Sequence, residues 1–292
     1  MLKQAYLIMI HEYTLVLKRL IQLLDDENSG IYIHVDKNAV SVGKNEIEKI
    51  QKLAKKSQIS IYRKYKVYWG TNSITNAEIF LLSKALNDKY DYYHVLSGAD
   101  LPIKPLKEIQ RFFEINNGKE FIHFGTEQYQ YDIIERYNVY HFFSRKLGRK
   151  RDKKFWVDAE TYSLAVQRRL HVDRTKRLDF SFYGGSNWCS ITRGFAQYAV
   201  KNYMKYKRAF RFSQISDEAV WQTIVMDSPY KENLYQKEYE NDYRACMRYI
   251  DWNRGTPYVF REDDFDDLMH SDCLFARKFD EKTDKGIIDR IY

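Results

Sequence analysis

A short apolar run that ends in small residues and a carboxylate constrains the fold of this chain most. Residues 92–96 read Tyr-Tyr-His-Val-Leu, and Ser97, Gly98, Ala99, Asp100 and Pro102 follow within a few positions. Such a run is typical of a strand that is buried on both faces of a parallel sheet. Ligands of open α/β sheets bind beyond the carboxyl ends of the strands, so Asp100 is a candidate ligand-binding residue. The alternative is that Asp100 caps a helix beginning near Leu106.

Strands and helices alternate along the first hundred residues. Apolar runs at 5–10, 31–36 and 59–62 indicate further strands, and helical spacing of apolar residues appears at 14–24 and 73–86. This alternation predicts an α/β fold with a mostly parallel central sheet flanked by helices. The second of these strands also ends in a carboxylate, Asp36. Neither a GxGxxG nor a GxxxxGK[ST] phosphate-binding loop is present.

Charge and aromatic content indicate the kind of partner. The formal charge is +8 and 16% of the residues are aromatic, including 25 tyrosines. A basic chain favours anionic partners, and tyrosine-rich pockets suit both sugars and bases. We disfavour a nucleic-acid-binding protein, since no recognised binding motif is present and the basic residues gather in one segment. That segment, residues 145–177, is either a solvated loop or a surface that meets an anionic acceptor or a membrane.

Two acidic pairs are candidates for chemistry. Ser216 is a good N-cap, which would place Asp217 and Glu218 in the first turn of a helix. The helix dipole alone explains such acids, and the rival interpretation is a catalytic acid on a rigid helix start. Asp264 and Asp266 form a DxD pattern, but at a helix start rather than after a buried strand. We therefore do not expect a metal site there.

Cysteine usage and the first residues bear on location. Cys189, Cys246 and Cys273 are an odd number without CxxC spacing, which predicts neither a disulfide framework nor a zinc site. The opening residues lack the order of a signal peptide, and no apolar run approaches 18 residues. These features lead us to expect a cytoplasmic protein.

Several short segments occur in the order in which one known family carries them. They are residues 5–11 (AYLIMIH), 33–36 (IHVD), 68–70 (YWG), 96–104 (LSGADLPIK), 185–186 (GS), 216–218 (SDE) and 274–279 (LFARKF). Together they resemble the inverting β-1,6-N-acetylglucosaminyltransferases that form core-2 and I-branches (glycosyltransferase family 14), a family that also includes the peptide O-xylosyltransferases. The resemblance covers about residues 4–281 and is weakest over 127–180.

The resemblance implies a GT-A-like fold without a DxD metal motif, a UDP-sugar donor and no metal cofactor. Glu218 matches the catalytic glutamate, whose role would be general base. In this family a lysine and an arginine would neutralise the leaving diphosphate in place of a metal. Lys278 matches the lysine directly. Arg254 lies nearest to the position of the arginine, and Arg277 is the alternative. The remaining donor-side candidates are His11, Asp36, Tyr68, Trp69, Gly70 and Asp100. The acceptor-side candidates are Glu135, Arg136, Ser186 and Trp252.

The expected reaction is inverting transfer of a sugar, N-acetylglucosamine first and xylose as the alternative, to a glycan hydroxyl. The alternative to an enzyme is a sugar-binding relative without catalytic activity. We expect one catalytic domain over 1–292, with a nucleotide-binding half at 1–125 and an acceptor half at 126–292. The animal members are membrane-anchored and disulfide-stapled, whereas for this chain we expect neither an anchor segment nor a disulfide framework. We therefore expect a bacterial member that builds surface polysaccharide on a lipid-diphosphate carrier, with segment 145–177 against the inner face of the membrane.

Overall fold

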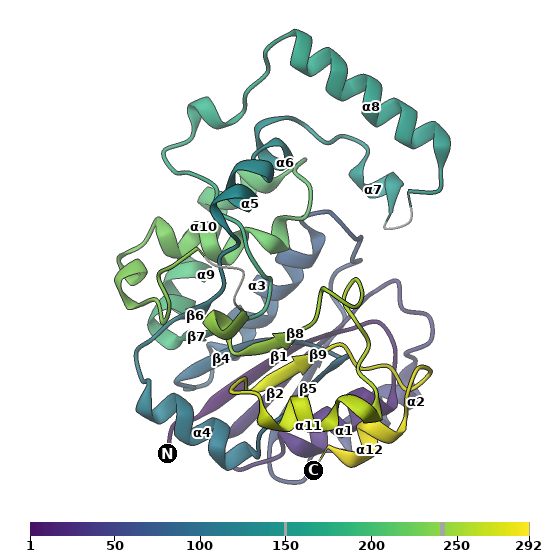
Figure 1. The fold of residues 1–292 in the computed structure, drawn as a ribbon, viewed down its shortest axis with the longest axis vertical. Helices are drawn as coiled ribbons and strands as arrows, with labels where there is room; N and C mark the ends of the chain where they lie inside the picture. Colours follow the sequence, from purple (N-terminus) through teal and green to yellow (C-terminus); the bar gives the residue numbers. More distant parts are fainter. Residues whose placement is uncertain (149–150, 240–242, 292) are drawn as a thin grey trace.

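A six-stranded sheet forms the centre of the computed structural model, which describes residues 1–148, 151–239 and 243–291 (Figure 1). The strand order is β3-β2-β1-β4-β7-β6. Strands β1 to β4 run parallel, whereas β7 is antiparallel to β4 and β6 is antiparallel to β7. The strands are β1 (Gln4–Ile10), β2 (Ser29–Val35), β3 (Gln58–Tyr62), β4 (Tyr92–Ser97), β6 (Phe121–Ile122) and β7 (Cys189–Thr192). The predicted mostly parallel sheet is confirmed.

A second, three-stranded sheet brings the C-terminal part of the chain to the end of β4. It contains β5 (Asp100–Pro102), β9 (Phe275–Arg277) and β8 (Arg248–Ile250), in the order β5-β9-β8. Strand β9 is antiparallel to β5 and parallel to β8, and Asp100 lies opposite Arg277 in the register. The segment that carries Lys278 therefore leaves this sheet beside Asp100.

Helices cover both faces of the central sheet, and each face has its own apolar core. Tyr6, Ile8 and Ile10 of β1 face one core, whereas Ala5 and Leu7 face the other. Alternate side chains of a strand point to opposite faces, so these apolar residues in succession give a strand buried on both sides. The first core includes residues of α1 (Leu15–Leu23), α2 (Lys44–Gln51), α4 (Leu106–Ile115), α11 (Phe265–His270) and α12 (Gly286–Arg290). The second includes residues of α3 (Ser73–Ala85), α9 (Arg193–Phe210) and α10 (Val220–Met226).

The basic segment contains a long helix instead of the loop that was one of its two interpretations. Helix α8 (Lys154–Arg169) lies at the far end of the molecule from the N- and C-termini (Figure 1). It is held by buried polar contacts: Glu160 accepts a hydrogen bond from His141, and Gln167 pairs with the backbone of Tyr140. Arg149 and Lys150 of the predicted basic segment lie outside the described residues.

Short helices fill the remaining connections. They are α5 (Glu127–Asp132), α6 (Glu135–Asn138), α7 (Ser144–Leu147), and the 3₁₀ turns η1 (Thr175–Arg177), η2 (Ser216–Glu218), η3 (Pro229–Asn233), η4 (Tyr243–Cys246) and η5 (Glu262–Asp264). All three cysteines are buried and carry free thiols. Across the described part of the chain, no helix combines the length and the apolar character that a membrane span requires.

Candidate active site

The carboxyl ends of β1 and β2 hold the first donor-side candidates. His11 directly follows β1 and is exposed. Asp36 follows β2, and its carboxylate accepts hydrogen bonds from the backbone N–H groups of Asn38 (2.8 Å) and Val67 (2.9 Å). The Asp36 side chain thus fixes the loop that leads to Tyr68 against the end of β2.

That loop connects the donor side with the segment carrying Glu218. The Tyr68 hydroxyl accepts a hydrogen bond from Arg145 (2.7 Å), whose guanidinium also lies 4.3 Å from the centre of the Tyr68 ring. Trp69 is 42% exposed and therefore available to a ligand. Gly70 has φ +73, a left-handed conformation that favours glycine, and its carbonyl accepts the N–H of Ile215 at 3.1 Å. Residues 68–70 and 215–218 are joined through this bond.

Asp100 is buried in the turn that follows β4. Its carboxylate accepts hydrogen bonds from the N–H (2.7 Å) and the hydroxyl (2.9 Å) of Ser97, and it lies 3.7 Å from the Arg277 Nε. The guanidinium of Arg277 stacks on Trp188 at 3.8 Å. The alternative of Asp100 as a helix cap is wrong, because Pro105 occupies the N-cap position of α4. Asp100 positions Arg277 and the turn at the end of β4 instead.

The two cations predicted for the diphosphate occupy connected loops. Arg254 donates to Asp251 (2.5 Å) and Asp264 (2.6 Å), and its guanidinium lies over the Tyr258 ring. The N–H of Lys278 donates to the Tyr258 carbonyl. Among the described residues no carboxylate is within ion-pair distance of the Lys278 ammonium. Two acids already neutralise Arg254, so Lys278 is the cation whose charge is more available to a ligand.

Asp264, the first acid of the DxD pattern, makes its contacts in the same loop as Arg254. Besides the ion pair with Arg254, the carboxylate of Asp264 accepts the N–H of Arg261 at 2.8 Å. It thereby caps the turn at η5 and holds Arg254. No group of three or more His, Cys, Asp or Glu side chains suited to a metal ion occurs within residues 1–148, 151–239 and 243–291.

Glu218 lies in a 3₁₀ turn and is held by two side chains from another segment. One of its carboxylate oxygens accepts hydrogen bonds from the Tyr129 hydroxyl of α5 (3.0 Å) and from Arg136 of α6 (2.8 Å). The Glu218 side chain is 36% exposed, so solvent and a ligand can still reach it. The contacts place a carboxylate beside an opening to solvent, which is what a general base requires.

The predicted helix cap at Ser216 is wrong. Ile215 adopts a left-handed conformation (φ 52), and Ser216 begins η2 with its hydroxyl 2.8 Å from the hydroxyl of Thr75 on α3. Helix α10 begins only at Val220, after Ala219. Glu218 therefore directs its carboxylate to Tyr129 and Arg136, and helix capping does not explain this acid.

A group of buried polar side chains lies behind Glu218, and sequence reasoning missed it. Burial, followed by the charge of Glu218, raises the pKa of Asp217 to about 7, and one of its oxygens is buried without a hydrogen-bond partner in the described structure. Burial, followed by the charge of Asp217, raises the pKa of Glu78 well above its usual value. Asn187 donates to Glu78 at 2.7 Å. Protonation of these acids limits the negative charge that accumulates around Glu218.

The acceptor-side candidates lie around Glu218 and toward α8. Arg136 pairs with Glu218, whereas the neighbouring Glu135 pairs with Arg168 of α8 at 3.0 Å in an exposed position.

The other two acceptor-side candidates, Ser186 and Trp252, come from different segments. Ser186 donates its N–H to His123. Trp252 is 47% exposed. Burial, with a smaller contribution from the charge of Glu218, raises the pKa of Tyr243 to about 12, and a hydrogen bond with Trp252 acts in the opposite direction. Glu218 and Trp252 therefore both lie near Tyr243.

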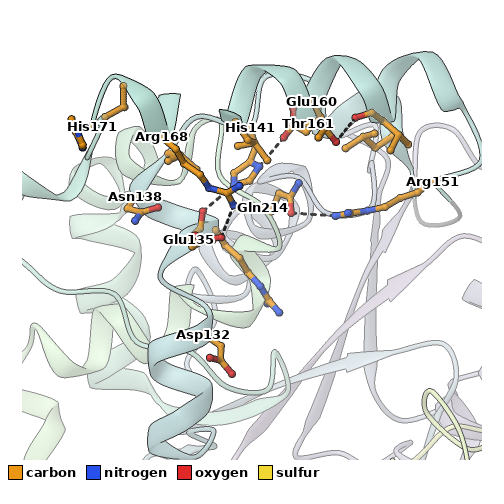
Figure 2. A pocket seen from close by; sticks show the side chains of 16 residues that line it. Asp132, Glu135, Asn138, His141, Arg151, Glu160, Thr161, Arg168, His171 and Gln214 are labelled. Atoms are coloured by element: carbon orange, nitrogen blue, oxygen red, sulfur yellow. Dashed lines mark hydrogen bonds and ion pairs between the residues drawn. The ribbon is translucent and has the colours of Figure 1, made fainter. Parts of the chain in front are cut away.

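A cavity of about 510 Å³ separates α8 from α5 and α6 (Figure 2). Figure 2 shows the ion pair of Glu135 with Arg168 and the contact of His141 with Glu160 at its wall. Acids and cations alternate around this space, which suits a neutral polar ligand better than a strongly charged one. The lining residues are Asp132, Glu135, Arg136, Asn138, Val139, His141, Leu147, Arg151, Val157, Glu160, Thr161, Leu164, Arg168, His171, Val172 and Gln214.

The family model of the Core-2/I-branching enzymes matches residues 4–270. The chain belongs to this family. Membership identifies it as a glycosyltransferase with a GT-A-like fold, and the family uses a nucleotide-sugar donor with a glycan or peptide acceptor.

Curated relatives of this Core-2/I-branching chain are named xylosyltransferases. The Xylosyltransferase sqv-6 of Caenorhabditis briggsae is 24% identical over 298 residues, which is 93% of this chain and 34% of the relative. Xylosyltransferase 2 of Rattus norvegicus is 22% identical over 304 residues, covering 98% of this chain and 33% of the relative. The Xylosyltransferase oxt of Drosophila pseudoobscura pseudoobscura is 23% identical over 290 residues. The chain spans about a third of the length of these relatives.

The hydroxyl of Tyr129 is the contact to Glu218 that sequence reasoning missed. We expect Tyr129→Phe to lower kcat by about 3- to 10-fold, because a hydrogen bond that orients the carboxylate contributes roughly 0.5–1.5 kcal/mol. The KM for the donor should not change, since Tyr129 contacts Glu218 and none of the donor-side candidates. Steady-state kinetics measure this, with the exposed Tyr131→Phe on the same helix as control. Equal kcat for the two variants would show that this bond does not position Glu218.

Proposed function

We propose that this chain is an inverting, metal-independent glycosyltransferase that uses a UDP-sugar, with Glu218 as the general base. The observation that carries the proposal is the placement of Glu218. Its partly exposed carboxylate is held by Tyr129 and Arg136 on a loop bonded to Gly70 of the donor side. A carboxylate so oriented can accept the proton of an acceptor hydroxyl as the oxygen attacks.

The reaction exchanges one bond at the anomeric carbon and transfers one proton. The acceptor oxygen bonds to the anomeric carbon from the side opposite UDP, its proton passes to Glu218, and the bond from the anomeric carbon to the diphosphate breaks. Attack from the opposite side converts an α-linked donor into a β-glycoside. The leaving diphosphate gains negative charge, and fixed cations that face this charge lower the barrier. We assign this role to Lys278, with Arg254 beside it and Arg277 as the alternative.

Two donor sugars are supported by different observations. The match to the Core-2/I-branching family supports N-acetylglucosamine, and the names of the curated relatives support xylose. Transfer from a panel of UDP-sugars in EDTA, with the anomeric configuration of the product read by NMR, tests the proposal. We expect a β-linked product from UDP-N-acetylglucosamine or UDP-xylose. An α-linked product, or transfer that requires an added metal, would contradict the proposed mechanism.

We further propose a bacterial role in surface polysaccharide synthesis, in the cytoplasm at the inner face of the membrane, on a lipid-diphosphate-linked glycan acceptor. The outer surface of α8 supports membrane contact. Phe155, Tyr162 and Leu170 are 71%, 73% and 68% exposed, and their spacing places them on one side of the helix and its C-terminal end. Lys154 and Arg169 are exposed beside them, whereas Arg168 faces Glu135 on the other side of the helix. An exposed apolar stripe with flanking cations is typical of a helix that lies in a membrane interface.

Sedimentation with vesicles tests the membrane contact. We expect binding that increases with the fraction of anionic lipid and falls several-fold in Phe155→Ser/Leu170→Ser, because these side chains would otherwise bury apolar area in the interface. Ile115→Ser is the control, since Ile115 is 72% exposed on α4, at the opposite end of the molecule from α8 (Figure 1). No dependence on anionic lipid would contradict the proposal.

A further inference from the structure

A second cavity, of about 480 Å³, lies beside Tyr68 and contains cations and hydroxyl groups in its wall. It lies between the beginning of α3, the segment around α7 and the residues that follow α9. No carboxylate is among its lining residues, in contrast to the cavity under α8. They are Lys66, Tyr68, Thr71, Asn72, Ser73, His141, Phe142, Ser144, Arg145, Arg211, Phe212 and Ser213.

Three cations give this cavity a positive potential. Lys66, Arg145 and Arg211 are exposed side chains, and none has an ion pair among the residues that the structure describes. Arg145 instead contacts Tyr68, and the guanidinium of Arg211 lies 4.9 Å from the Phe212 ring centre. His141 also reaches the wall, but it is paired with Glu160 at 2.7 Å. Three cations around one space, without a compensating acid in the lining, favour an anionic ligand.

The hydroxyl groups and the aromatic rings narrow the chemistry of the ligand. Ser73, Ser144 and Thr71 add polar groups to the wall, and a phosphate group accepts hydrogen bonds from both hydroxyls and guanidinium groups. Phe142 and Phe212 also line the cavity and are 51% and 38% exposed, with ring centres 5.5 Å apart. Exposed rings beside a cationic cavity suit an anion that is attached to an apolar group.

The cavity shares a wall with the segment that carries Glu218. Ser213 lines the cavity, and Glu218 follows five positions later along the same loop. On the other side Thr71 lines the cavity, next to Gly70, whose carbonyl binds the N–H of Ile215. A ligand bound in this cavity would therefore lie beside the segment that carries Glu218, the proposed general base.

We propose that this cavity binds a phosphate group attached to an apolar chain, with Lys66, Arg145 and Arg211 contacting the phosphate and Phe142 and Phe212 contacting the chain. This ligand would be part of the acceptor substrate, and that identification rests on the proposed function. The binding site itself is defined by the cavity alone and can be tested without sugar transfer.

The test is direct binding of farnesyl phosphate, measured by isothermal titration calorimetry below its micelle concentration, with and without saturating UDP. Inorganic phosphate and farnesol are the comparison ligands. We expect farnesyl phosphate to bind more tightly than either. UDP should not displace it, because Tyr68 is the one donor-side candidate in the lining and neither of the donor-side cations, Lys278 and Arg254, lines the cavity. Displacement by UDP, or binding of inorganic phosphate with equal affinity, would overturn the proposal.

Charge variants locate the binding. In Lys66→Ser/Arg145→Ser/Arg211→Ser we expect the affinity for farnesyl phosphate to fall by at least about tenfold. The control Lys107→Ser/Arg111→Ser/Lys119→Ser removes the same charge from exposed positions on and after α4. Arg211→Glu, a single change at an exposed side chain, gives a second measurement if the triple variant folds poorly. Equal affinity of the Arg211→Glu and control variants would overturn the proposal, whether or not UDP-sugar transfer is observed.

Discussion

Glu218→Gln is expected to lower the rate of sugar transfer by about 10²–10⁴-fold, the usual contribution of a general base. The amide has the same size as the carboxylate, and its oxygen can still accept hydrogen bonds from Tyr129 and Arg136. It cannot take the proton of the acceptor hydroxyl. The loss should therefore appear in kcat, while UDP still binds, because Glu218 is not among the donor-side residues.

Asp217→Asn is the matched control, since this neighbouring acid lies on the same turn. Burial raises the pKa of Asp217 to about 7, so near neutral pH about half of the Asp217 side chains are already protonated and an amide removes less than a full negative charge. We expect transfer within a few-fold of the unmodified protein. If Asp217→Asn abolished transfer and Glu218→Gln did not, the base would be Asp217.

Lys278→Ala is expected to lower transfer by about 10²–10³-fold, as the removal of one group that stabilises developing charge does in other enzymes. Lys278 has no ion pair within the described ranges, so its charge is not already offset by an acid. Removing it leaves the diphosphate to Arg254, whose charge is shared with Asp251 and Asp264. Both kcat and the affinity for UDP should fall, measured by kinetics and by calorimetric titration with UDP.

The matched control for this change is Lys285→Ala, since Lys285 is exposed and pairs with Asp289 at the surface. We expect its transfer rate and UDP affinity to be unchanged. Equal behaviour of the Lys278 and Lys285 variants would remove Lys278 from the donor site. Arg277, which lies between Asp100 and Trp188, would then be the cation to test next.

The sequence predicted the central sheet because the signals for it are local. Apolar runs followed by Asp36 and Asp100 show the strands and their ends, and β1, β2 and β4 lie where these runs predicted them. The antiparallel partners β6 and β7 were not predicted as part of the same sheet. Strand β6 has only two residues, and its pairing with β7 joins parts of the chain far apart in sequence.

The arrangement around Glu218 depends on contacts that no local pattern encodes. The hydrogen bond between Thr75 and Ser216 joins residues 141 positions apart. The left-handed conformation of Ile215 starts a 3₁₀ turn at Ser216, so Ser216 is not the N-cap that the sequence predicted. Tyr129 is one tyrosine among 25, so nothing in the sequence singles it out.

Helix α8 was hidden for a different reason. Its apolar side chains lie on two sides, with Phe155 and Tyr162 exposed and Val157 and Leu164 facing the cavity, so they do not form the single apolar stripe by which a helix is recognised.

The sequence left open whether Arg254 or Arg277 accompanies Lys278, and the structure shows how the two arginines differ. Arg277 directly precedes Lys278 in the sequence, and Arg254 lies over Tyr258, whose carbonyl accepts the N–H of Lys278. Sequence spacing alone does not show which arginine would face the diphosphate. Arg254 is partly exposed and held by two acids, whereas the Arg277 side chain is only 13% exposed and stacks on Trp188. Greater exposure makes Arg254 the more accessible cation, and its two carboxylates fix its orientation.

Thermal stabilisation by UDP in the presence of EDTA is the measurement that tests the central claim most directly, with GDP and CMP as controls. A nucleotide that binds only the folded protein raises Tm, and the rise increases with the ratio of its concentration to its Kd. We predict a rise in Tm that is selective for UDP, that persists in EDTA and that is not increased by manganese. Stabilisation only with manganese would mean that a metal holds the diphosphate in place of Lys278 and an arginine. No response to any nucleotide would contradict a UDP-sugar donor.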